Sequence, residues 1–256
     1  MMHTDRNDDV VDFWNRVAGD WDIQVGEEGD NNRQLNSDPV LWRFAGIVKG
    51  LKVLDAGCGT GYLSRKLHRK GAIVTGIDIS YKMIEIAQKK SPSITYHVDS
   101  CSTLARLEDN YFDLIIANYV LMDTPDLEAT MKAFNRVLRP GGAAVVIFSH
   151  PCFPQGRATV SEDRDTISYN WDFPYFDKCK RVDPPWGHFK SDFIWFHRSL
   201  SDYWKAFKQA GFTVDDMEEP RITRDRYHQA GTAKLLNNSK TRPYSIAFRL
   251  TKSTHT

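Results

Sequence analysis

A short apolar run leads into three alternating glycines in Val53-Leu54-Asp55-Ala56-Gly57-Cys58-Gly59-Thr60-Gly61-Tyr62-Leu63. This order predicts a strand, a tight turn and then a helix. Glycines lack a Cβ where a ligand must lie against the backbone, and the first N–H groups of a helix have no partner within it. The stretch is typical of a nucleotide-binding turn. NAD-binding proteins carry G-x-G-x-x-G at the same point, however, and a bare turn could hold no ligand at all.

Apolar runs and amphipathic segments alternate on both sides of this turn. We expect strands or helices, in chain order, at 9–21, 37–47, 52–55, 62–70, 72–78, 82–90, 94–97, 112–117, 127–138, 143–149, 199–210, 212–217 and 244–251. Short apolar strands between amphipathic helices predict a parallel sheet that is covered on both faces. Between the first two helices, the polar residues 26–36 predict a mobile loop.

Polar and glycine residues mark the expected ends of several helices. Ser37 or Asp38 is a candidate N-cap for the second helix, with Pro39 in its first turn. Ser80 is the expected cap of the helix at 82–90. Near the end of the chain, Ser199 or Ser201 could begin a helix that stops at Gly211. The Arg139-Pro140-Gly141-Gly142 stretch predicts a turn before the strand at 143–149.

The glycine spacing carries a more specific resemblance than the turn alone. Asp55-x-Gly57-x-Gly59-x-Gly61 resembles motif I of class I methyltransferases that depend on S-adenosylmethionine (SAM). The stretch 136–142 is similar to the family's turn before strand five, and Ala210-Gly211-Phe212 is similar to its entry into strand six. The resemblance is close over about residues 50–150 and looser over the last fifty. Within the family it is nearest to the small-molecule, type 11-like branch that includes quinone-biosynthetic C-methyltransferases.

The resemblance implies an α/β fold: a Rossmann-like, seven-stranded, mostly parallel sheet with helices on both faces, an antiparallel last strand and an inserted lid after strand five. It implies a single domain over 1–256. Within it we expect N-terminal helices that cover the cofactor at 1–48, a SAM-binding core at 50–149, a substrate lid at 150–195, and a C-terminal helix and strand pair at 196–256. SAM would be the cofactor and S-adenosylhomocysteine its product.

The resemblance also assigns positions around SAM. Asp78, at the end of the second strand, would accept the ribose hydroxyls, although a turn or helix-cap role is the alternative. Asp99 would meet the adenine, with Ser100 and Cys101 beside it or simply in a loop. The segment 13–22 resembles the family's opening segment, so Trp14 and Trp21 are candidate cover residues; a helix that simply packs on the domain is the alternative. The full expected set is Trp21, Asp55, Gly57, Cys58, Gly59, Gly61, Tyr62, Leu63, Asp78, Ile79, Met83, Asp99, Ser100, Cys101, Asn118, Tyr119 and Val120.

His150 and Tyr119 are the candidate catalytic residues. His150 follows strand five, at the edge of the sheet where ligands bind in such folds, so it could serve as a general base; packing or a contact with the lid is the alternative. His188 and His197 are weaker candidates. The aromatic side chains of 150–195 favour a small hydrophobic or aromatic acceptor, although aromatic residues also fill cores or could stack on nucleic acid bases.

The charge balance, apolar runs and cysteine spacing of the chain limit the kinds of partner that it is expected to bind. Lys and Arg number 34 and Asp and Glu 33, so no overall field favours nucleic acid or an anionic membrane. The sequence shows no secretory leader and no apolar run of about 18 residues, which predicts a cytoplasmic protein. Four cysteines without metal-ligand spacing predict free thiols and no metal site. An NAD-dependent oxidoreductase and a non-catalytic SAM-binding protein stay open as alternatives, as do the atom that is methylated and the oligomeric state, a homodimer included.

Overall fold

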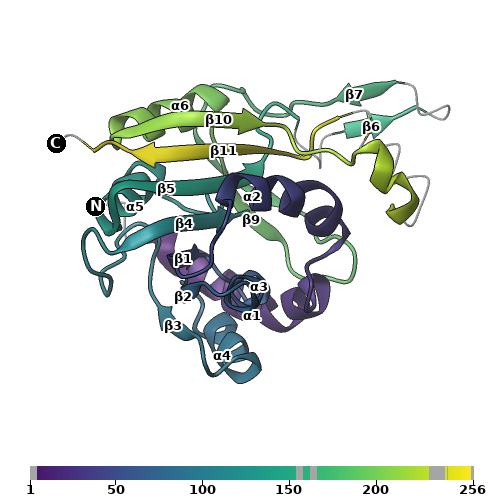
Figure 1. Cartoon of the computed structure of the whole chain (residues 1–256). Helices are drawn as coiled ribbons and strands as arrows, with labels where there is room; N and C mark the ends of the chain where they lie inside the picture. Colours follow the sequence, from purple (N-terminus) through teal and green to yellow (C-terminus); the bar gives the residue numbers. More distant parts are fainter. Residues whose placement is uncertain (1–4, 154–157, 162–165, 231–239, 241, 255–256) are drawn as a thin grey trace.

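A seven-stranded sheet forms the centre of the computed structural model, which describes residues 5–153, 158–161, 166–230, 240 and 242–254. Its strands follow the order β10-β11-β5-β4-β1-β2-β3 (Figure 1). They are β1 (Lys52–Ala56), β2 (Ile73–Asp78), β3 (Thr95–Val98), β4 (Phe112–Asn118), β5 (Leu138–Ser149), β10 (Phe212–Glu218) and β11 (Ser245–Lys252). The strands from β1 to β5 pair in parallel, whereas β11 is antiparallel to both β5 and β10. The predicted sheet is confirmed.

Helices cover both faces of this sheet because successive strand residues point to opposite sides. On β1, Val53 packs among residues of α2 (Asp38–Ala45), α3 (Tyr62–Arg69) and α4 (Tyr81–Lys90). The next residue, Leu54, packs on the other side with α5 (Leu127–Val137) and α6 (Leu200–Gln209). Both side chains are fully buried, so the sheet separates two apolar cores.

Three predicted helix ends are confirmed by their capping contacts. Ser80 begins α4, and its Oγ accepts a hydrogen bond from the N–H of Met83 at 3.2 Å. Ser199 begins α6 in a capping box with Asp202. Gly211 follows α6 at a φ of +86°, a conformation that glycine adopts without strain.

The predicted loop at 26–36 is wrong over its second half. Residues 31–32 are helical, and a π-helical turn, η1 (Arg33–Ser37), continues directly into α2. Ser37 therefore has helical backbone angles and makes no capping contact, which overturns both proposed caps. The polar composition of 26–36 suggested exposure, but Arg33, Asn36 and Ser37 are buried against the rest of the domain. The first helix, α1 (Asp5–Val25), also runs further than predicted at both ends.

The turn predicted at residues 139–142 lies inside β5 rather than before it. Leu138 pairs with Phe112, and pairing with β4 resumes where Ala143 faces Leu114. The residues between form a bulge in the ladder, so β5 starts five residues earlier than predicted. Among the described residues, no helix is long and apolar enough to cross a membrane.

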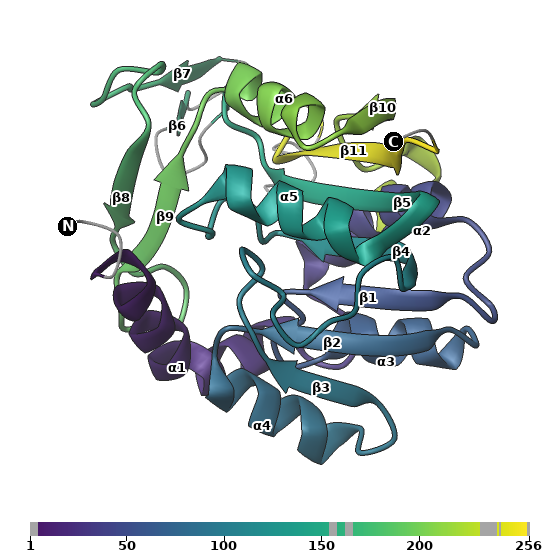
Figure 2. The same cartoon turned by 90° about the vertical axis from the view of Figure 1, so that its left-hand side faces the viewer.

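The segment predicted as a lid, 150–195, contains two antiparallel hairpins. One joins β6 (Ala158–Val160) to β7 (Ile167–Tyr169), and the other joins β8 (Cys179–Asp183) to β9 (Phe193–His197). Figure 2 shows α1 and the β8–β9 hairpin next to each other, on the side of the sheet to which β1 and β2 point. Residues 154–157 and 162–165 of the predicted lid lie outside the described part of the chain.

Candidate functional site

A cavity lies where the carboxyl ends of the parallel strands meet α1. Its empty space is about 830 Å³, with the open solvent at its mouth included. Its lining comes from α1 and η1, from the turns after β1 and β2, and from the loops after β3 and β4. The lining residues are Val10, Trp14, Trp21, Val25, Arg33, Gly57, Cys58, Gly59, Thr60, Tyr62, Asp78, Ile79, Met83, Ser100, Cys101, Ser102, Asn118, Tyr119, Val120, Asp123, Thr124 and Pro125.

The glycine turn after β1 brings backbone to the cavity surface. A Cβ on Gly57 would lie 2.5 Å from Cγ2 of Val120, and one on Gly59 would lie 3.4 Å from Nε1 of Trp21. Both glycines have positive φ, so a side chain at either position would strain the turn. Trp21 can therefore lie directly over the turn.

Gly61 serves packing rather than the cavity. Its Cβ would lie 2.7 Å from the hydroxyl of Tyr96, and its φ is +82°. The turn is held from the α3 side by Arg65, whose Nη1 donates to the carbonyl of Thr60 at 2.8 Å. Of the three motif glycines, Gly57 and Gly59 belong to the lining and Gly61 supports them from behind.

Asp78 lies at the end of β2 and faces the cavity beside the glycine turn. Its carboxylate accepts hydrogen bonds from the N–H of Gly59 and from the N–H of Ser80, each at 2.9 Å. Burial raises the pKa of Asp78 to about 6, although these backbone donors act in the opposite direction. The carboxylate is thus fixed in place, and its remaining lone pairs can accept hydroxyl groups of a ligand.

Asp55 lies deeper than the cavity surface. It is 2% exposed, and Ser64 Oγ donates to its carboxylate at 2.5 Å. Burial and, to a smaller extent, the nearby charge of Asp78 raise the pKa of Asp55 to about 7, although the hydrogen bond from Ser64 acts in the opposite direction. Asp55 is not part of the described lining, so any effect on a ligand would pass through an intervening group.

Arg33 brings a buried positive charge to the cavity from η1. Its guanidinium carbon lies 5.1 Å from the ring centres of Trp21 and Tyr119 and 5.8 Å from that of Tyr62. Its Nη1 forms an ion pair with Asp30 at 2.6 Å. The Nε of Arg33 has no hydrogen-bond partner among the described residues. An anionic or polar ligand group would find both a charge and a free donor here.

Hydrogen bonds between asparagine amides and tyrosine hydroxyls join the segments that line the cavity. Asn118 at the end of β4 donates from Nδ2 to the hydroxyl of Tyr62 at 2.7 Å. Asn32 donates in the same way to the hydroxyl of Tyr119, also at 2.7 Å. Tyr119 has a φ of +58°, which is uncommon outside glycine and marks a constrained backbone. The N-terminal helices and the end of β4 therefore form one hydrogen-bonded wall.

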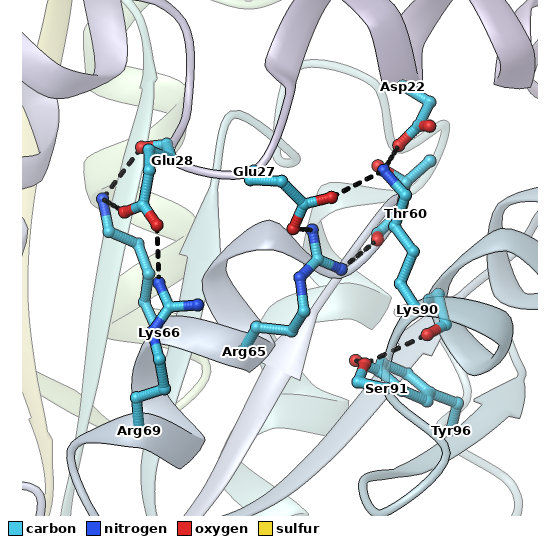
Figure 3. A network of polar contacts seen from close by, with 11 residues as sticks. Asp22, Glu27, Glu28, Thr60, Arg65, Lys66, Arg69, Lys90, Ser91 and Tyr96 are labelled. Atoms are coloured by element: carbon cyan, nitrogen blue, oxygen red, sulfur yellow. Dashed lines mark hydrogen bonds and ion pairs between the residues drawn. The ribbon is translucent and has the colours of Figure 1, made fainter.

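A group of ion pairs ties the end of α1 and the turn after it to α3 and α4 (Figure 3). Lys90 of α4 lies 2.6 Å from the carboxylate of Asp22 and 3.0 Å from that of Glu27. Glu27 also pairs with Arg65 at 3.0 Å. Because Lys90 donates a hydrogen bond to Glu27, the pKa of Glu27 is lowered from its usual range. These contacts hold α1 over the glycine turn.

The cavity brings together most of the residues that the resemblance assigned to SAM. Its lining includes Trp21, Gly57, Cys58, Gly59, Tyr62, Asp78, Ile79, Met83, Ser100, Cys101, Asn118, Tyr119 and Val120. Outside the described lining are Asp55, Gly61, Leu63 and Asp99. Leu63 is buried in the core that contains α2 and α3. Asp99 accepts hydrogen bonds from the N–H groups of Ser100 and Arg106, at 2.8 and 3.0 Å, which orders the loop after β3.

The structure does not bring His150 to this cavity. His150 Nε2 lies 2.9 Å from Oε1 of Glu219, and its Nδ1 accepts from the N–H of Cys152 at 3.2 Å. Burial lowers the pKa of His150 from its usual range. His188 and His197 likewise direct Nε2 toward backbone carbonyls, at 3.0 and 2.7 Å. His150 lies at the predicted edge of the sheet, but its ring turns toward Glu219, just after β10, which the local sequence does not reveal.

The predicted lid contributes no described residue to the cavity lining, which α1 covers instead. Aromatic side chains of 150–195 pack on α1 from outside. The rings of Phe189 and Trp21 are 6.1 Å apart, and those of Phe193 and Phe13 are 5.3 Å apart. These aromatic residues therefore support the helix that closes the cavity.

Several lining residues were not predicted from the sequence: Val10, Val25, Arg33, Thr60, Ser102, Asp123, Thr124 and Pro125. Arg33 lies in the segment 26–36, which was predicted to be a loop. The spacing of Asp30 and Arg33, three apart, was the one available sign of a helical turn there. Thr60 and Ser102 lie next to predicted positions, so a wider window around each motif would have found them.

Known proteins with similar sequences are methyltransferases. Residues 54–146 match a family described as a methyltransferase domain. A demethylmenaquinone methyltransferase from Staphylococcus aureus is 31% identical over 182 residues, which cover 65% of this chain and 70% of that protein. In the described part of the chain, no group of three or more His, Cys, Asp or Glu side chains could hold a metal ion.

Solved structures show the same fold. An S-adenosylmethionine dependent methyltransferase from Mesorhizobium loti superposes with a TM-score of 0.73 at 24% identity, over 89% of this chain and all of that one. A magnesium protoporphyrin IX methyltransferase from Synechocystis, solved with bound SAM, gives a TM-score of 0.62 at 19% identity, over 99% of this chain and 100% of that one.

Proposed function

Because this chain belongs to the class I SAM-dependent methyltransferase family, we propose that its cavity transfers the methyl group of SAM to a small apolar or aromatic molecule. The observation that carries the proposal is Asp78, which faces the cavity directly beside the glycine turn. A carboxylate in this position can accept the two hydroxyls of a ribose.

The residues of the cavity fit SAM. Three lining residues carry a buried polar atom without a partner among the described residues: Nε of Arg33, Oγ1 of Thr60 and Oδ1 of Asn118. We assign the carboxylate of the methionine part to Arg33, because a guanidinium binds carboxylates strongly. Asp55 would act on the amino group through an intervening water, since it lies behind the surface of the cavity.

The adenine would lie among the side chains that follow β2 and β3. Ile79 and Met83 offer apolar surface, and Ser100, Cys101 and Ser102 form the opposite edge. Asp99 orders this loop, which supports an indirect role in binding adenine. Trp21 would close over the cofactor from α1.

SAM supplies an electrophilic methyl group, and the protein's contribution is largely positional. Displacement requires the nucleophile, the methyl carbon and the sulfur in line, so fixed walls accelerate it by orienting the reactants. Asn118 and Tyr119 are tied to Tyr62 and Asn32 by hydrogen bonds of 2.7 Å, which fixes the wall beside the methionine part. Tyr119 acts here by positioning, and α1 excludes water.

The part of the lining beyond these residues supports an apolar acceptor. Val10, Trp14, Val120 and Pro125 are apolar and lie on the side of α1 and the loop after β4. The relative from Staphylococcus aureus is named for demethylmenaquinone, itself a small molecule.

The balanced charge of the chain argues against nucleic acid as the substrate. The four free cysteines support a cytoplasmic location for the enzyme.

Calorimetric titration tests the proposed function. S-adenosylhomocysteine should bind the purified protein, NADH should not, and Asp78→Ala should weaken the first interaction. Binding of NADH alone would instead favour an oxidoreductase. Binding of S-adenosylhomocysteine with no product from any apolar acceptor in the presence of SAM would favour a non-catalytic SAM-binding protein.

A further inference from the structure

Asp123 is an acidic residue in the cavity that the binding of SAM leaves without a role. It lies in the loop between β4 and α5, and the cavity lining continues from it through Thr124 and Pro125. Its side chain is partly accessible. Among the described residues, none donates a hydrogen bond to its carboxylate or forms an ion pair with it. By contrast, Asp78 in the same cavity accepts from two backbone N–H groups.

Arg198 fixes the backbone on both sides of Asp123. It is 5% exposed, and it donates to the carbonyls of Leu121, Thr124 and Pro125 at 3.2, 2.6 and 2.9 Å. The N–H of Phe196 donates to the carbonyl of Met122 at 2.8 Å. Residues just after the predicted lid therefore hold this loop rigidly. The carboxylate of Asp123 is presented to the cavity while the nearby arginine is engaged with backbone.

The electrostatic surroundings of Asp123 suit a proton acceptor. Burial raises the pKa of Asp123 well above its usual range, and the charge of Asp78 raises it further. The positive charges of Arg198 and Arg33 act in the opposite direction. A carboxylate whose pKa is raised by burial is a stronger proton acceptor when ionised than an ordinary surface carboxylate.

We propose that Asp123 receives the proton of the nucleophile, so that the acceptor is an apolar molecule whose methylated atom carries a hydrogen, as in a phenolic hydroxyl or an amine. The inference rests on the proposed function. Val10, Trp14 and Pro125 contact the apolar body of this molecule, and Asp123 accepts a hydrogen bond from its O–H or N–H group.

The step balances in atoms and charge. A lone pair of the oxygen or nitrogen forms the new bond to the methyl carbon, and the carbon–sulfur bond breaks with its electron pair left on sulfur. The sulfonium thereby becomes the neutral thioether of S-adenosylhomocysteine. The proton of the nucleophile passes to the carboxylate of Asp123 and from there to solvent.

Three naphthalene probes test the inference on protein saturated with S-adenosylhomocysteine. 1-Naphthol and 1-aminonaphthalene carry a donor, and 1-methoxynaphthalene does not. Calorimetry should show at least one donor probe binding about tenfold or more tightly than the methoxy probe. Asp123→Asn should reduce that preference, because an amide oxygen accepts more weakly than a carboxylate, and Asp123→Leu, which leaves no acceptor, should abolish it. Glu108→Gln removes an exposed carboxylate from another loop and should retain it.

The pH dependence separates a proton acceptor from a purely structural residue. The preference for the donor probes should rise with pH as Asp123 ionises and should be flat in Asp123→Asn. Equal binding of all three probes, binding of neither donor probe, or an unchanged preference in Asp123→Asn each contradicts the inference. Failure of the wild-type protein to bind S-adenosylhomocysteine would contradict the proposed function instead. Each variant must bind S-adenosylhomocysteine as the wild type does, which shows that it is folded.

Discussion

Asp78 shows how one side chain combines a structural and a binding role. Its contacts with Gly59 and Ser80 fix the glycine turn and the start of α4, while its free lone pairs face the cavity. Asp78→Asn keeps the size of the side chain but replaces one acceptor with a donor. We expect S-adenosylhomocysteine to bind about 10- to 100-fold more weakly, as measured by calorimetry. Unchanged affinity would mean that the ribose lies elsewhere.

The same residue predicts a pH dependence of binding. In the proposed function the ionised carboxylate would accept the ribose hydroxyls, and burial raises the pKa of Asp78 to about 6. Protonation therefore competes with the ligand below this pH, and affinity should fall by about tenfold per pH unit there. Titrations between pH 4.5 and 8 should show a plateau on the alkaline side for the wild type. The Asp78→Asn protein should lack this inflection.

Asp55 predicts a pH dependence of folding. Its pKa is raised to about 7 in the folded protein, so between the unfolded value and about 7 the folded state binds more protons. The free energy of unfolding contributed by Asp55 is thus present at acidic pH and lost as pH rises through about 7. Asp55→Asn should gain on the order of 2 kcal/mol over the wild type between pH 5 and pH 8, by urea denaturation at each pH. A constant difference would contradict the raised pKa.

At the scale of elements, α1 is the cover of the cavity. The sequence assigned this role jointly to the N-terminal helices and to the segment 150–195. The structure gives the lining to α1 and η1, with the β8–β9 hairpin packed behind α1. Opening the site would then require α1 to separate from α3 and α4, where the ion pairs of Figure 3 lie.

Lys90 and Lys89 form a matched pair of variants for this idea. Lys90 joins α4 to Asp22 and Glu27, whereas Lys89 pairs with Glu85 within α4. Lys90→Ala should weaken binding of S-adenosylhomocysteine a few-fold, because partly exposed ion pairs contribute about 0.2–1 kcal/mol each. It should also speed amide hydrogen exchange in α1. Lys89→Ala should do neither, and the effect of Lys90→Ala should shrink at high salt.

At the scale of the whole molecule, the antiparallel strand β11 lies between β5 and β10 and contributes to the core that also contains α5 and α6. Phe248 on β11 is 1% exposed and lies 5.3 Å from the ring of Phe207 and 5.9 Å from that of Phe148. Phe248→Ala should lower the free energy of unfolding by about 3–5 kcal/mol in urea denaturation. Phe176 is 80% exposed, so Phe176→Ala should change it by less than about 0.5 kcal/mol. Equal effects of the two substitutions would contradict the arrangement of the core.

The sequence by itself determined the sheet, the glycine turn, the place of Asp78 and the caps at Ser80 and Ser199. These features depend on local spacing and on backbone conformations that few residues adopt, so they can be read along the chain.

Only the tertiary structure decided the positions of Arg33, Asp123 and His150. Arg33 is buried against three rings, all of them from other elements, and Asp123 lies in a loop that Arg198 fixes from 75 positions further on. The ring of His150, which follows β5, contacts Glu219, which follows β10, and β11 lies between these two strands in the sheet. The direction and burial of such side chains depend on which distant segments pack together, and neither composition nor periodicity contains that information.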